Sequence, residues 1–269
     1  MERSQFDKLD ENGRQSFLDE RRLPEHKEEI ISENMLLVKK MIADSVSSDT
    51  FMIQSINSIE ELDKVCNTLT KRIREWYGYY FPEMNYLIQD NEEFIRKVIE
   101  KSKESFMAEK DIKISMGPEL SQKDIDAIID FARQVSALYS QRERIMKYLE
   151  DVMKSYCPNI LALTGAMIAA KLLEKAGSLR QLSRLPSSTI QLLGAEQALF
   201  RHLRNKRIRP PKHGFILSHP LVGQAKNKGQ AARMLAAKIS IASKIDYFKG
   251  EFIGDKLKRE LEEQMGRQK

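Results

Sequence analysis

Two long stretches with apolar residues at alternating steps of three and four constrain the fold of this chain most. Such spacing places side chains on one face of an α-helix, and over several heptads it is typical of helices that pack together. In the stretch 58–80 the stripe consists of Ile59, Leu62, Val65, Leu69, Ile73, Trp76 and Tyr80. In the stretch 121–153 it consists of Ile125, Ile128, Ala132, Val135, Tyr139, Met146, Leu149 and Met153. Arg142 occupies the one polar position of this stripe. The pattern predicts two long amphipathic helices, in either an antiparallel coiled-coil arm or a simple helical bundle.

Local signals mark where helices begin and end. Ser58 with Glu61 predicts a helix start at a capping box, and Ser121 with Asp124 predicts another. Further helices are expected at 25–47, 161–177, 189–204 and 228–248. The Asn12-Gly13 step near the N-terminus is compatible with a small hairpin or with a frayed tail. Because no period-two run and no repeat is present, the predicted fold class is mainly α.

The first stripe ends in an aromatic segment, REWYGYYFPE, at residues 74–83. Aromatic rings are frequent where a long helix packs against another element, and exposed rings form docking surfaces. The sequence leaves both interpretations open.

Charge is distributed unevenly along the chain. Residues 1–150 contain 23 basic and 30 acidic residues, whereas residues 151–269 contain 22 and 9. The 49 residues from 197 to 245 include eleven Lys or Arg and no carboxylate. A block of one sign predicts an anionic partner, and its concentration in one half of the chain favours nucleic acid.

Six basic residues within twelve positions form the centre of this block: Arg201, Arg204, Lys206, Arg207, Arg209 and Lys212. Together they would offer a continuous basic ridge to a phosphate backbone. Phosphate contacts do not read sequence, so specificity requires flat side chains that stack on splayed bases. His219 and Phe215 are candidates for stacking, and a structural role for His219 beside Pro220 is the alternative.

No pattern typical of an enzyme is present. The chain has no H-E-x-x-H, P-loop or G-x-G-x-x-G, and three of its four histidines lie in the basic block without a nearby carboxylate. Cys66 and Cys157 lack the spacing of metal ligands or of a secreted disulfide framework. We therefore expect no catalysis, no cofactor and no metal. The lack of a long apolar run and of a signal core predicts a soluble cytoplasmic protein without membrane contact.

Six segments resemble the Nop-domain family, which scaffolds box C/D guide-RNA ribonucleoproteins: DTFMIQSINSIEELDKV, REWYGYYFPE, AGSLRQLSRLPSSTIQLLGAE, GAEQALFRHL, HGFILSHPLVGQA and ARMLAAKISIASKIDYF. The resemblance covers residues 49–250, and the chain looks like an archaeal member of the family. The resemblance implies three parts: a reduced N-terminal module (1–48), a helical linker with an antiparallel coiled-coil arm (49–155) and a helical Nop domain (156–250). A charged tail (251–269) follows in the sequence.

The resemblance also implies a set of partners. An N-terminal module would hold the methyltransferase fibrillarin, and the coiled coil would pair with a second copy as a homodimer. The Nop domain would bind a kink-turn in box C/D guide RNA jointly with a small ribosomal-protein-like factor. The particle would methylate ribose 2′-hydroxyls of rRNA, with the scaffold contributing position alone. A spliceosomal-type Nop-domain factor and a coiled-coil adaptor with a non-specific polyanion-binding domain are the alternatives.

Particular residues follow from the family's motifs. The resemblance implies a composite protein–RNA surface at Gly194, Ala195 and Glu196, phosphate contacts from Arg201, Arg204 and Lys206, and packing of His219 on the RNA stem. Secondary RNA-binding candidates are Gln224, Lys226, Lys228, Arg233 and Lys238. The chain departs from the family at Gln197, where a lysine is usual. It also has only 48 residues before DTFMIQS, where the family often has a larger α/β domain.

Overall fold

The computed structural model describes residues 27–266, and the chain divides after Ser47 into two units. Every regular element within the described residues is a helix, which confirms the predicted mainly α class. The described part of the first unit is α3 (Lys27–Ser45), the helix expected at 25–47, and none of its residues is buried. The expected hairpin at Asn12-Gly13 lies outside the described residues.

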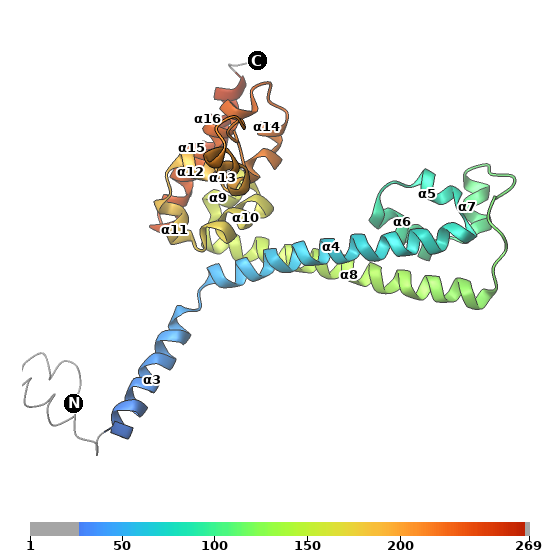
Figure 1. Ribbon diagram of the computed structural model, residues 1–269, viewed down its shortest axis with the longest axis horizontal. Helices are drawn as coiled ribbons and strands as arrows, with labels where there is room; N and C mark the ends of the chain where they lie inside the picture. The colour runs from blue at the N-terminus through green and yellow to red at the C-terminus, as the bar shows by residue number, and fades with distance from the viewer. Residues whose placement is uncertain (1–26, 267–269) are drawn as a thin grey trace, which may run out of the picture. The chain divides into compact units, whose positions relative to one another are not determined.

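The second unit consists of a pair of long helices, a small group of helices at one end of the pair, and a helical head. The long helices are α4 (Ser48–Tyr80) and α8 (Gln122–Tyr156), which lie side by side and run in opposite directions (Figure 1). We call this pair the arm. Its far end, the tip, contains α5 (Glu83–Leu87), α6 (Asn91–Glu100) and α7 (Lys103–Glu109). The elements of the head are α9 (Pro158–Thr164), α10 (Ala166–Ala176), α11 (Leu179–Arg184), α12 (Ser187–Leu192), α13 (Glu196–Arg204), η2 (Phe215–Ser218), α14 (Pro220–Gly223), α15 (Lys228–Tyr247) and α16 (Gly254–Gly266).

The two helices of the arm meet along a seam with heptad spacing. On α8 the seam residues are the predicted ones, which are buried or half-buried. On α4 the seam consists of Met52, Ile56, Ile59, Asp63, Cys66, Thr70, Ile73, Tyr77 and Tyr80. Arg142 pairs with Asp63, and the Thr70 hydroxyl lies 3.3 Å from that of Tyr139. Matched polar pairs inside an apolar seam define the register of two helices. The supercoiling of a true coiled coil stays a prediction.

Two predictions for α4 are wrong. The helix begins at Ser48 and not at Ser58, because Met52 and Ile56 continue the seam into the base of the arm and are fully buried there. The predicted stripe also mixes two neighbouring rows. Val65 and Trp76 are 44% and 43% exposed, outside the seam. Steps of three and four fit both rows, so the spacing alone could not identify the buried one.

The exposed large apolar side chains of α4 and α8 all precede a seam residue by one position. They are Phe51, Val65, Trp76 and Tyr79 on α4 and Tyr148 on α8. In an antiparallel helix pair, equivalent positions beside the seam flank the same side of the pair. Half-buried Leu62, Leu69, Leu138 and Ile145 occupy further positions of these two rows. The arm therefore has one apolar face, which we call the arm face.

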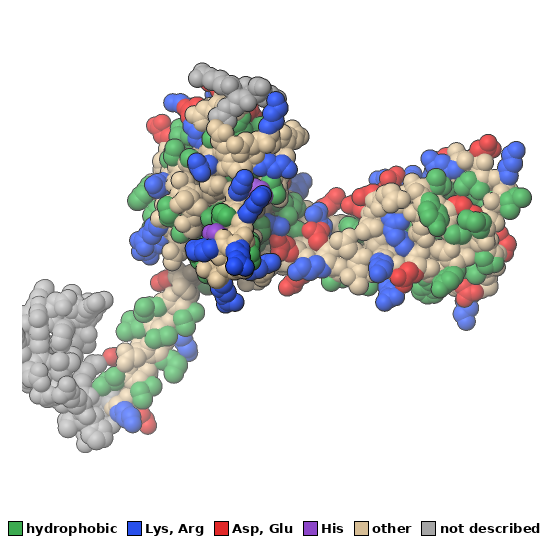
Figure 2. All heavy atoms as spheres, turned by 45° about the horizontal axis from the view of Figure 1, so that its top comes forward, with side chains coloured by type: hydrophobic (Ala, Val, Ile, Leu, Met, Phe, Trp, Pro, Cys, Tyr) green, Lys and Arg blue, Asp and Glu red, His purple; other side chains and the backbone are tan. Residues whose placement is uncertain are grey.

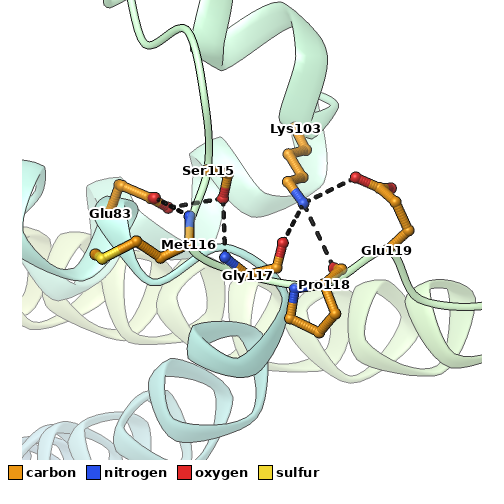
Figure 3. A network of polar contacts seen from close by, with 7 residues as sticks. All are labelled: Glu83, Lys103, Ser115, Met116, Gly117, Pro118 and Glu119. Carbon is orange, nitrogen blue, oxygen red and sulfur yellow. Dashed lines mark hydrogen bonds and ion pairs between the residues drawn. The ribbon is translucent and has the colours of Figure 1, made fainter.

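A buried lysine fastens the connection from α7 to α8 at the tip (Figure 3). The Lys103 side chain is 3% exposed, and its Nζ donates to the carbonyl of Gly117 and to Oε1 of Glu119, both at 3.0 Å. The carboxylate of Glu83 accepts a hydrogen bond from the Ser115 hydroxyl at 3.0 Å. The loop that carries the chain from one arm helix to the other is thus held by directional contacts.

The head packs around α15, which contacts α9, α11, α12, α14, α16 and η2. Buried alanines on α15 let these neighbours approach closely: Ala231, Ala232, Ala236 and Ala242. Two predicted helices are each divided in the structure, 161–177 at Gly165 and 189–204 at Gly194, because both glycines have positive φ angles. Leu257 and Leu261 of α16 are buried in the same apolar cluster as α15.

Candidate nucleic-acid interface

The turn before α13 has a shape that requires glycine. Gly194 has a φ angle of +88°, and a Cβ atom there would lie 2.7 Å from the ring of Phe215. The Phe215 N–H donates to the carbonyl of Leu193 at 2.8 Å. The Gly194 N–H donates to Oε1 of Glu196 at 2.7 Å. Two of the predicted composite-surface residues, Gly194 and Glu196, therefore bond to each other and shape the start of α13.

All six central basic residues, from Arg201 to Lys212, are exposed, and no ion pair among the described residues involves them. Side-chain contacts hold the loop that carries most of them. Gln191 Nε2 donates to the carbonyl of Lys212 at 2.6 Å, and Nδ1 of His202 lies 2.5 Å from the carbonyl of Ile208. Lys and Arg side chains are prominent on the face of the head seen in Figure 2. The loop thus presents uncompensated positive charge, as an anion site requires.

A shallow hollow on α13 combines charge with apolar surface. It is lined by Gln197, Phe200, Arg201 and Arg204. Phe200 is 60% exposed, and no residue of α13 is buried. Guanidinium groups beside a flat ring can bind a partner that presents phosphate next to an apolar or aromatic group. Phe200 is not among the residues predicted from the sequence, since nothing in a sequence distinguishes an exposed phenylalanine from a buried one.

The basic loop meets the beginning of α15. The side chain of Lys212 packs over Gly229, where an added Cβ would lie 3.3 Å from Lys212 Cδ. Four of the secondary candidates are exposed: Gln224, Lys226, Lys228 and Arg233. Lys238 differs, because its Nζ lies 2.5 Å from Oε2 of Glu260 and its side chain is 12% exposed. Its charge is neutralised, so the structure does not add Lys238 to the basic surface.

His219 lies inside the head. It is 7% exposed, its Nε2 lies 3.2 Å from the carbonyl of Leu163, and its Nδ1 has no protein partner among the described residues. Burial lowers the pKa of the imidazole below its ordinary value, and the contact with Leu163 opposes this effect. The ring is out of reach of a stacked base in this conformation. The contacts favour the structural interpretation of His219 over the expected stacking role.

Within residues 27–266, no helix is both long and apolar enough to cross a membrane. No group of three or more His, Cys, Asp or Glu side chains in the same range could hold a metal ion.

Comparison with known proteins relates both the head and the arm to one family. Residues 58–267 match the family model Nop, described as "snoRNA binding domain, fibrillarin". A NOP5 family protein of Methanocaldococcus jannaschii is 38% identical over 84% of this chain and 58% of its own length. Nucleolar protein 58 of Schizosaccharomyces pombe is 41% identical over 74% of this chain and 42% of its own. The chain thus spans about half the length of the curated relatives it matches.

A solved structure has a similar arrangement of helices. The crystal structure of a fibrillarin/Nop5p complex contains a chain that is similar with a TM-score of 0.51 and 27% identity. The match covers 90% of this chain and 80% of that one.

Proposed function

The chain belongs to the Nop family, and from this premise we propose that it is the non-enzymatic scaffold of a box C/D guide ribonucleoprotein. In this proposal the head binds kink-turn guide RNA together with a small kink-turn-binding protein. The particle recruits fibrillarin, which methylates ribose 2′-hydroxyls of rRNA at sites chosen by guide pairing. The proposed divisions of the chain are those expected from its sequence.

The observation that carries this proposal is the exposed face of α13. Phe200 and Leu203 are 60% and 53% exposed beside the guanidinium of Arg204. Large apolar side chains that are left in solvent next to cations suit a joint surface, in which a protein covers the rings and RNA phosphates meet the cations. A site for RNA alone would not need Leu203. We therefore propose that the kink-turn-binding protein and the RNA both contact α13.

Fibrillarin is proposed as a partner because the description of the matching family names it and the similar solved structure is a complex with fibrillarin. The scaffold's contribution to methylation is to hold catalyst and target at a defined distance, which lowers the entropic part of the barrier.

The arm face supports the proposal of a homodimer. Five large apolar side chains, each 43–73% exposed, lie on one side of a helix pair at heptad spacing. A second copy with the same face would cover these side chains about a two-fold axis and complete a four-helix arrangement.

The proposed function is tested by binding a kink-turn RNA with and without the small kink-turn-binding protein. We expect strong binding only when that protein is present.

In the presence of that protein, Phe200→Ala should weaken binding about tenfold or more, as loss of a central aromatic contact does. Arg201→Gln with Arg204→Gln should reduce the salt dependence by about one unit of slope per lost phosphate contact. Gel shift titrations at several salt concentrations measure both effects.

The matched control is Phe248→Ala, which removes a 76% exposed ring at the other end of α15 from the basic loop and should leave binding unchanged. Equal affinity for the kink-turn and for an unrelated duplex would contradict the proposal and favour a general polyanion binder. Failure to retain fibrillarin would favour a spliceosomal-type factor. Reconstitution with guide RNA, the kink-turn-binding protein and fibrillarin, followed by mapping of ribose methylation, tests the complete activity.

A further inference from the structure

The carboxylate of Asp49 connects the arm to the head at the base of the arm. Asp49 lies in the first turn of α4 and is 7% exposed. Its Oδ2 accepts a hydrogen bond from the hydroxyl of Tyr156, the last residue of α8, at 2.9 Å. Its Oδ1 accepts one from the backbone N–H of Leu179, the first residue of α11, at 3.0 Å. One side chain therefore joins both arm helices to the head.

The remaining contacts across this joint are of a different kind. Met52 and Ile56 from the arm share an apolar cluster with Leu172 and Leu182 of the head. Apolar contact stabilises the joint, but it is not directional, so it permits small rotations. The ion pair between Glu60 and Lys171, at 2.8 Å, is partly exposed, and such pairs contribute little. Hydrogen bonds to a buried carboxylate are both directional and strong.

We propose that Asp49 is a positioning residue that fixes the angle between the arm and the head. The effect of such a residue is amplified by the length of the arm. At 1.5 Å per residue, the 33 residues of α4 extend about 50 Å, so a rotation of about 10° at the base displaces the tip by about 9 Å. In the proposed particle, on whose function this consequence rests, that displacement would move the assembly on the arm relative to RNA held by the head.

The test measures the angle in the free protein, so it does not depend on the proposed function. Spin labels are placed on exposed positions of the arm and the head, through Arg133→Cys on α8 and Lys244→Cys on α15. The native cysteines, Cys66 and Cys157, are buried. Dilution with unlabelled protein isolates the distance within one chain. We expect Asp49→Ala to broaden or shift the measured distance distribution, because both hydrogen bonds are lost.

Two variants make the test specific. Asp49→Asn should retain the native distribution, since its carbonyl can accept from Leu179 N–H and its amide can donate to the Tyr156 oxygen. Asp151→Ala is the matched control, because Asp151 is an exposed carboxylate on α8 near the same joint. Tyr156→Phe keeps the ring and removes one hydrogen bond, so it serves if Asp49→Ala does not fold. A native distribution in Asp49→Ala, or in Tyr156→Phe where that variant serves, would overturn the proposal.

The consequence for methylation is measured separately in the reconstituted particle. Asp49→Ala should lower the methylation rate by about tenfold to a hundredfold, as ångström-scale misplacement does, while RNA affinity stays within about twofold. A wild-type particle without activity would refute the proposed function and leave the distance measurement valid. An altered distance with an unchanged rate would support Asp49 as the positioning residue and refute the need for a fixed angle.

Discussion

At the scale of single residues, burial separates side chains that the sequence grouped together. Lys238 and Lys228 belong to the same basic block, but one is paired with Glu260 and the other is exposed. His219 belongs to the segment HGFILSHPLVGQA, and Nε2 of its ring lies 3.2 Å from the carbonyl of Leu163 in the interior of the head. This contact joins α9 to the residue that directly precedes α14.

The buried histidine makes stability depend on pH. Because the pKa of His219 is lowered in the folded protein, the unfolded chain binds the proton more readily. This contribution to stability is complete above the ordinary histidine pKa near 6.5 and is lost as the pH falls below it, by up to about 1.4 kcal/mol per pH unit. His219→Gln should therefore show a smaller drop in unfolding free energy between pH 7.5 and 5.5. Denaturant titrations at the two pH values measure this drop.

The control for this prediction is Ser218→Ala, at the exposed position next to His219, which adds and removes no titratable group in this pH range. It should retain the wild-type pH dependence. An equal pH dependence in His219→Gln and in the wild type would contradict the assignment. If His219→Gln at pH 7.5 folds but loses affinity for the RNA complex, direct RNA contact by His219 would regain support.

At the scale of elements, α13 depends on the turn before it for its position. None of its residues is buried, so packing alone does not hold it. The turn is held instead by the Phe215 ring against Gly194 and by the Phe215 N–H to the carbonyl of Leu193. Lys171 Nζ lies 5.7 Å from the centre of the Phe215 ring, on its face. The helix proposed to bind RNA is thus positioned by residues that lie outside it.

A pair of glycine substitutions tests this dependence. Gly177 and Gly194 have similar φ angles, +84° and +88°, but a Cβ at Gly177 would contact nothing within 4 Å. Gly177→Ala should cost about 1–2 kcal/mol of stability from the left-handed backbone alone and leave RNA binding intact. Gly194→Ala should cost more, because the methyl group overlaps the Phe215 ring, and should weaken binding to the RNA complex. Thermal unfolding and gel shifts measure the two effects, and equal affinities for the two variants would refute the role of the turn.

At the scale of the whole molecule, the arm face is the largest apolar feature of α4 and α8 that remains in solvent. The seam beside it is complete without a partner, with the Asp63–Arg142 pair in its polar layer. The face therefore is available for assembly and is not required for the arm to form.

Lysines introduced on the arm face should prevent dimerisation without disturbing the folding of the chain. Val65→Lys with Trp76→Lys should convert a dimer of twice 31.2 kDa into a monomer, since two lysines on each copy would meet a matching face of the same sign. Helix content should stay the same, because both side chains are substantially exposed. Sedimentation equilibrium measures the mass. Tyr86→Lys, at a 78% exposed position on α5 outside the two rows, is the control and should remain dimeric. A monomeric wild-type protein would refute the proposed homodimer.

The sequence by itself determined the mainly α class, the existence of both arm helices, the α8 seam and the charge asymmetry of the chain. It determined them because heptad spacing, caps and net charge are local properties. The cap at Ser121, for example, accepts the N–H of Asp124 as predicted. The family's motifs were also readable without coordinates.

Only the tertiary structure decided which of two adjacent rows on α4 faces inward, because Val65 and Cys66 fit helical spacing equally well and the partner helix selects between them. It decided that Gly194 divides one predicted helix, because the ring that requires glycine there comes from Phe215, further along the chain. It also decided that His219 is buried, that Lys238 is paired and that Phe200 is exposed. Each of these outcomes depends on contacts between residues distant in sequence, which no local pattern records.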